Sequence, residues 1–181
     1  MVGLRKQFTA ITGTLFNIDH AAYSLFQGNT YAVGGAITKA KIVEAAMLTV
    51  DKGNMSDLVC LVGTKAWAAL NAEDMALRVF DSSYKAEKSQ SGVRELIFEN
   101  VNGQIKVVCH PMVKQSEFFL FAPDELLWVG SSKPTFEIPG MADKFFRLVD
   151  GSNAIEIQSY ADLAIFALKP SQTVVGTGIT Y

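Results

Sequence analysis

The pair Asn102-Gly103 lies between two runs of strand-forming residues, and it constrains the fold more than any other short stretch of the chain. Residues 96–98 (Leu-Ile-Phe) precede the pair, and residues 105–108 (Ile-Lys-Val-Val) follow it. A tight connection between antiparallel strands requires positive φ angles, which asparagine and glycine adopt readily. The sequence therefore predicts a β-hairpin with residues 102–103 as its loop.

Residues 38–51 have the composition of a packed helix. Thr38 can cap the first turn, and Gly53 suits the residue that follows the last turn. Apolar residues occupy most of the circumference, so we expect the helix to be covered on several sides. These residues are Ile42, Val43, Ala45, Ala46, Met47, Leu48 and Val50.

Short apolar runs separated by turn residues indicate a sheet. Residues 58–62 are continuously apolar, which is typical of a strand covered on both faces. Residues 118–121, 126–129 and 163–168 form similar runs, whereas residues 155–159 alternate and predict one buried and one solvated face. Together these elements predict an α+β architecture, with one or two helices on a mostly antiparallel sheet.

The segment after the strand at 58–62 is predicted to be helical and then polar. Thr64 can cap a short helix over 65–70, and Asn71 can cap a further helix to about Val79. Residues 81–95 are rich in serine, lysine and glutamate. A polar connection of this length within a compact domain is either mobile or functional, and as a functional loop it is expected to carry contacts with other molecules.

The composition fits a folded chain of one domain or two small lobes. The chain has 181 residues, of which 49% are hydrophobic and 19% are charged. Its 16 basic and 18 acidic residues give a net charge of -2, which provides no basic surface for sequence-specific nucleic-acid binding. No leader-like segment and no apolar run of roughly 20 residues is evident. We therefore expect a soluble protein of cytoplasmic origin with no membrane partner.

Residues that commonly carry catalysis are few and scattered. Cys60 and Cys109 lie in apolar runs, and His20 and His110 are far apart in the sequence. Either cysteine could act as a nucleophile with a histidine as base, but no spacing favours that arrangement. A metal site needs several convergent ligands, and none are clustered here. We therefore expect no catalytic, cofactor-binding or metal-binding residues, and no enzyme activity.

In their order and spacing, these segments resemble the C-terminal, axial-domain portion of the major capsid protein of tailed bacteriophages. The turn Gly34-Gly35 and the helix at 38–51 are similar to the start of that domain. The remaining matches are common strands and turns whose sequence order carries the resemblance. They are 58–62 with Trp67-Ala68-Ala69-Leu70-Asn71, 102–108 with His110-Pro111-Met112, 118–123 with Leu126-Leu127-Trp128-Val129-Gly130, and 162–170.

The resemblance implies the phage major-capsid fold, which encapsulin shells share. In chain order, it implies a remnant of the peripheral domain over 1–33 and the axial domain over 34–142. A return through the peripheral domain follows over 143–160, and the closing strand of the axial domain over 161–181. Family members are usually longer, so the chain is expected to represent the axial-domain portion of such a subunit.

The resemblance also implies a function in assembly. The expected role is a structural subunit that forms pentamers and hexamers of an icosahedral capsid, made in the host bacterial cytoplasm and located in the virion. Its partners would be copies of itself, with scaffold, decoration and portal proteins as further candidates, and it would enclose DNA without reading its sequence. An encapsulin-like shell holding cargo enzymes is the alternative, and a small enzyme or ligand-binding domain is a third reading. The loop 81–95 would make adaptable contacts between subunits.

Overall fold

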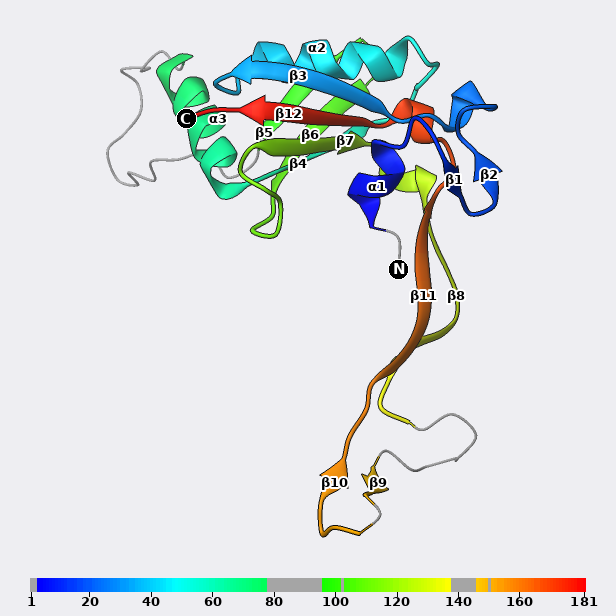
Figure 1. The fold of residues 1–181 in the computed structure, drawn as a ribbon. Coiled ribbons are helices and arrows are strands. Elements are labelled where there is room, and N and C mark those ends of the chain that lie inside the picture. Colours follow the sequence, from blue (N-terminus) through cyan, green and yellow to red (C-terminus); the bar gives the residue numbers. More distant parts are fainter. Residues whose placement is uncertain (1–2, 78–95, 102, 138–145, 150) are drawn as a thin grey trace, which may run out of the picture.

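A six-stranded mixed sheet forms the centre of the computed structural model, which describes residues 3–77, 96–101, 103–137, 146–149 and 151–181 (Figure 1). The strand order is β3-β12-β7-β4-β6-β5. The pairs β3–β12 and β4–β6 are parallel, and the other three are antiparallel. The strands are β3 (Asn29–Gly35), β4 (Leu58–Val62), β5 (Leu96–Asn100), β6 (Gly103–Cys109), β7 (Glu117–Phe121) and β12 (Val174–Ile179).

Two helices cover one face of this sheet, and a short helix covers part of the other. α2 (Lys39–Val50) and α3 (Thr64–Leu77) share a hydrophobic cluster with inward residues of all six strands. α1 (Leu4–Phe8) contributes Phe8 to a second, smaller cluster that includes Phe121 and Val175. The α+β class and the mostly antiparallel strand pairing are therefore confirmed.

A close approach within the larger cluster explains one glycine. Gly176 lies in β12, and Phe118 lies opposite it in β7. A Cβ atom at residue 176 would lie 2.0 Å from Cε1 of the Phe118 ring, well inside the contact distance of two carbon atoms. The absent side chain therefore makes room for a fully buried ring at the centre of the sheet.

The strand predicted at 58–62 is confirmed as β4, between β7 and β6. Cys60 on one face is fully buried beneath the helices, while Val59 and Leu61 pack partly against the smaller cluster. The hairpin is also confirmed, but its loop is displaced by one residue. Asn100 pairs with Gly103, so Gly103 begins β6 with φ 150° and is not a loop residue.

The helix predicted at 38–51 is confirmed as α2, but it is fully buried along one face only, and the two helices predicted after residue 64 are one helix, α3. α3 runs without a break through Asn71, because residues 64–77 contain no glycine or proline and one asparagine costs little within a helix. In α2 the fully buried side chains, Ile42, Ala45, Ala46 and Thr49, lie along one face, while Val43 and Leu48 are half-buried. Thr38 caps the helix as expected, through a hydrogen bond from the Lys41 amide to its Oγ1.

Two long strands leave the sheet and form a separate ribbon. β8 (Leu126–Thr135) and β11 (Tyr160–Ala167) pair antiparallel, and the short strands β9 (Arg147–Leu148) and β10 (Ile155–Glu156) pair farther out. We call these four strands the arm, and the six-stranded sheet with its helices the body. Figure 1 shows the arm extending well away from the body.

Short elements surround the point where the arm leaves the body. They are β1 (Thr14–Leu15), β2 (Ile18–Asp19) and the 3-10 helices η1 (Ser24–Phe26), η2 (Pro123–Glu125) and η3 (Pro170–Gln172). η2 leads into β8, and η3 connects β11 to β12. The predicted closing segment 161–181 therefore contains both an arm strand and a strand of the central sheet. The division into peripheral and axial segments stays a prediction.

Candidate assembly surface

The cysteines and histidines singled out in the sequence do not form a Cys-His pair. Cys60 is fully buried, and this burial raises the pKa of its thiol, which keeps the thiol neutral. Nδ1 of His20 lies 2.5 Å from the Phe26 carbonyl oxygen, and Nδ1 of His110 accepts a hydrogen bond from the Met112 amide at 3.3 Å. Each histidine is thus engaged with backbone groups near itself in sequence.

The described residues form neither a cluster of metal ligands nor a helix that could span a membrane. In this part of the chain, no three His, Cys, Asp or Glu side chains converge in a way that could hold a metal ion. Among the helices described, none is both long enough and apolar enough to cross a lipid bilayer. The small pocket beside His20 has a volume of about 10 Å³, which is room for about one water molecule.

The arm places large apolar side chains on both of its faces. Its register sets Trp128 opposite Ile165 and Leu127 opposite Phe166. Directly opposed residues share a face, and successive residues alternate between faces, so each face of the ribbon receives one of these pairs. Trp128 is 71% exposed and Leu127 is 43% exposed. The ribbon therefore has no apolar face that the chain itself covers completely.

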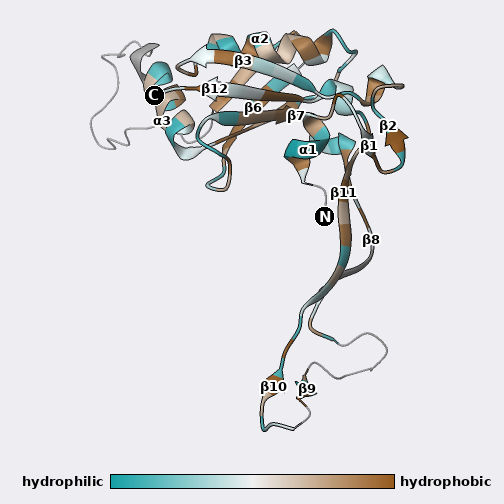
Figure 2. Ribbon diagram, viewed as in Figure 1, coloured by the Kyte–Doolittle hydropathy of each residue, from teal (hydrophilic) through white to brown (hydrophobic). Residues whose placement is uncertain are grey.

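The outer part of the arm repeats this pattern. Its exposed large apolar residues are Phe136, Phe146, Leu148, Val149, Ile155 and Ile157. Figure 2 shows β10 in the colour of hydrophobic residues, at the far end of the arm. The alternation at 155–159 predicted a buried face, but Ile155 and Ile157 are each 62% exposed. That prediction is wrong for the single chain, because β10 pairs with two-residue β9 and no other described part of the chain covers it.

An isolated two-stranded ribbon is marginally stable in water, and contiguous exposed apolar residues mark sites of interaction. Covering a tryptophan as exposed as Trp128 would contribute on the order of 3 kcal/mol. The arm has several such residues along its length. Its surface is therefore the strongest candidate for a functional site in the part of the chain that the structure describes.

Backbone irregularities in β8 bend the arm and disrupt one of its edges. The register shifts twice, between the pairs Ala164–Val129, Asp162–Ser132 and Tyr160–Thr135, and each shift leaves an extra residue in β8. Gly130 lies in the first bulge, where an added Cβ atom would be 1.9 Å from the Asp162 carbonyl oxygen. Pro134 lies in the second and has no N–H to donate to another strand. These features favour contact through the faces of the arm over strand addition at the β8 edge.

The sequence patterns predicted both arm strands, but no motif predicted that the two strands pair with each other. Residues 126–129 and 163–168 were recognised as apolar runs, and pairing them requires a contact across some thirty residues that no turn motif specifies. Phe8, Phe118 and Phe121 lie buried in the core. Trp128 and Phe136 do not, and their exposure became evident only from the fold. The loop 81–95 lies outside the described residues.

Comparison with known proteins adds a structural similarity. No protein-family model matches the chain, and no curated protein matches it. Among solved structures, the chain is similar to a virus-like particle from Pyrococcus furiosus, with 12% sequence identity and a TM-score of 0.43. The match covers 75% of this chain and 48% of that chain, so the chain spans about half the length of the protein to which it is similar.

Proposed function

We propose that the chain is a structural subunit that assembles with copies of itself into a closed shell, and that the arm is a principal contact between copies. The observation that carries this proposal is the arm, a ribbon projecting from the body with large apolar side chains exposed on both faces. Such a ribbon is stabilised when a neighbouring molecule covers it. In a shell of identical subunits, each arm lies on a neighbour and each body receives another arm, which is a head-to-tail contact that closes by rotation.

The finer identity proposed is the capsid subunit of a tailed bacteriophage, forming pentamers and hexamers around DNA in the virion. This rests on the order and spacing of the sequence segments that resemble the family, from Gly34-Gly35 to residues 162–170. Scaffold, decoration and portal proteins are further proposed partners. A shell subunit needs no reactive centre, and we propose that this one has none. An encapsulin-like shell around cargo enzymes is the second proposal, based on the same resemblance.

The arm contact is tested by changing one exposed apolar residue in the arm and one outside it. Trp128→Lys places a charge on the arm, and Met112→Lys places the same charge at a position in the body that is at least as exposed. Sedimentation velocity and negative-stain electron microscopy would compare both variants with the unchanged protein. We expect large particles from the unchanged protein and from Met112→Lys, and separate subunits from Trp128→Lys with an unchanged circular dichroism spectrum.

Two outcomes would contradict the proposal. One is an unchanged protein that remains a monomer or small oligomer under all assembly conditions. The other is assembly of Trp128→Lys as efficient as that of Met112→Lys. The contents of purified particles distinguish the two finer proposals, because a capsid would protect DNA from added nuclease and an encapsulin-like shell would retain cargo proteins.

A further inference from the structure

α1 has no means of being stable by itself. It comprises five residues, and the residue before it, Gly3, provides no side-chain cap. A helix of one turn is far below the length that is stable in water, so contacts with the rest of the protein must hold it in place. Its position is therefore defined by what its side chains bind.

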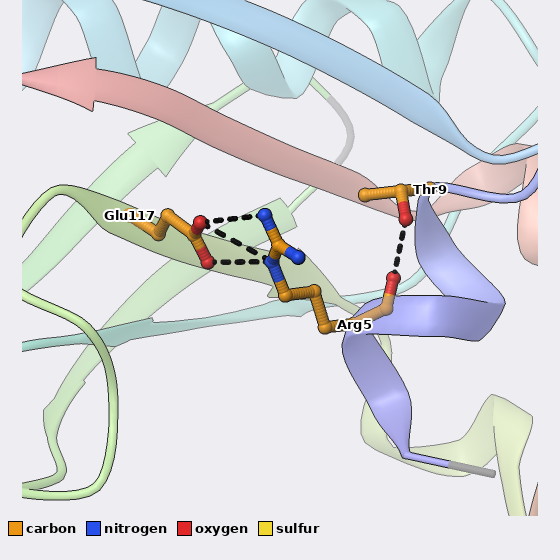
Figure 3. A network of polar contacts seen from close by, with 3 residues as sticks. All are labelled: Arg5, Thr9 and Glu117. Carbon is orange, nitrogen blue, oxygen red and sulfur yellow. Dashed lines mark hydrogen bonds and ion pairs between the residues drawn. The ribbon is translucent and has the colours of Figure 1, made fainter.

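Three side chains of α1 reach different parts of the protein. Arg5 donates to both carboxylate oxygens of Glu117 in β7, at 2.9 Å from Nε to Oε2 and 2.9 Å from Nη2 to Oε1 (Figure 3). Phe8 is fully buried against the rings of Phe119 and Phe121, with centroids 6.4 and 5.7 Å away. Both contacts attach α1 to the body.

The third side chain, Gln7, attaches α1 to the arm. Its Nε2 donates to the Ile165 carbonyl oxygen at 2.7 Å, and its Oε1 accepts from the Ala167 amide at 3.0 Å. In an antiparallel ribbon, alternate residues direct both backbone groups away from the partner strand. The Gln7 amide binds these outward groups of β11 as a third strand would, and the side chain is only 3% exposed.

Other contacts also hold the arm at this point, which we call the root: the Leu168 amide donates to the Glu125 carbonyl oxygen at 2.9 Å, and Ala167 and Leu126 pack in the cluster that contains Phe8. Lys169 forms an ion pair with Glu125 at 3.0 Å, and the rings of Phe16 and Phe166 meet edge to face at 5.1 Å.

Among the contacts at the root, the two hydrogen bonds of Gln7 bind the backbone of β11 itself. A rearrangement that moved the arm would break these two hydrogen bonds and disturb the cluster shared by Phe8, Ala167 and Leu126. The direction of the arm therefore depends strongly on the contacts of α1.

We infer that α1 is a latch that fixes the direction of the arm relative to the body, and that its release lets the arm pivot at the root. Arg5 and Phe8 hold the body side of the latch, and Gln7 holds the arm side. In a shell, this pivot would let identical subunits occupy non-identical positions. That use rests on the proposed function. The latch itself does not.

The test measures the distance between the arm and the body in separate subunits. Spin labels would be placed at Ser159→Cys in the arm and Met112→Cys in the body, both exposed, with Cys109→Ser removing the half-buried thiol. The background would also carry Trp128→Lys, so that the measurement uses separate subunits whether or not the unchanged protein forms shells. Failure of the latch and failure of the shell proposal are then distinguishable.

Each side of the latch is broken by a separate variant. Gln7→Leu keeps the side-chain volume and removes both hydrogen bonds to β11, whereas Arg5→Leu removes only the attachment to β7. We expect both to replace one narrow distance distribution with a broad one, and Lys6→Leu, on the exposed face of the same helix, to leave it narrow. In hydrogen exchange, Gln7→Leu is expected to reduce protection of the Ala167 amide about tenfold.

Distributions that stay as narrow in Gln7→Leu and Arg5→Leu as in Lys6→Leu would overturn the latch. So would broadening in Gln7→Leu alone, because a purely local role at the arm does not require the attachment of α1 to the body. Thermal unfolding of each variant is the control for global destabilisation. A variant that has unfolded would be recognised there and replaced by the conservative Gln7→Glu or Arg5→Lys.

Discussion

At the scale of single residues, the chemistry of this protein is that of a packed interior. Cys60 shows this best, since it is fully buried between β7 and β6 and its pKa is raised by that burial. A raised pKa means that the folded state favours the neutral thiol more than the unfolded state does. The stabilising effect is complete below the ordinary thiol pKa and is lost as the pH rises through the folded-state pKa.

Cys60 is therefore expected to resist thiol reagents until the protein unfolds. In a Cys109→Ser variant, where Cys60 is the remaining thiol, the rate of reaction with a disulfide reagent should follow global unfolding. Its dependence on denaturant should match that of the circular dichroism signal. Rapid labelling under native conditions would instead mean that β4 is reached by local opening.

At the scale of elements, short-range patterns predicted structure well and long-range pairing poorly. The hairpin β5–β6 and the capped helix α2 depend on residues close together in the sequence, and both were found. The pairing of β8 with β11 depends on contacts between distant segments, so no local motif could reveal it. Ile155 and Ile157 follow the pattern of a half-buried strand, yet the layer that would bury them does not come from the described residues of this chain.

The same reasoning limits what sequence could say about the site. Trp128 and Phe136 are large apolar residues of the kind that usually lies in a core. They are exposed because the arm projects from the body. Gln7 carries no sequence signal at all, because its role depends on a contact with residues Ile165 and Ala167 near the other end of the chain. Local elements of the body could be predicted from the sequence, whereas the parallel pairs β3–β12 and β4–β6, the arm and its root could not.

Gly130 allows the first bulge of β8, and the bulge sets the path of the arm. Gly130→Ala would place a Cβ atom 1.9 Å from the Asp162 carbonyl oxygen, so the first bulge cannot persist. We expect amide protection to fall along β8 and β11 while the protection of β4 and β7 is retained, as measured by hydrogen exchange and mass spectrometry. Gly3→Ala, where an added Cβ atom meets no other atom within 4 Å, is the control. Unchanged protection in the arm would contradict this account of the bulge.

At the scale of the whole molecule, the body buries its own apolar residues, whereas the arm needs another surface to cover the apolar residues that it exposes. The body buries its apolar residues in two clusters on opposite faces of the sheet. The arm leaves its own apolar residues in water, and a chain that folded only for itself would gain nothing from that arrangement. Under the proposed function, contact with further copies would cover each arm with a neighbour.

The most direct test of this central claim is electron cryo-microscopy of the purified, assembled protein. We predict closed particles in which the side chains of Trp128 and Ile157 are buried against a neighbouring copy of the chain. Particles in which both side chains remain in solvent, or a preparation containing only separate subunits, would contradict the claim that the arm joins copies into a shell.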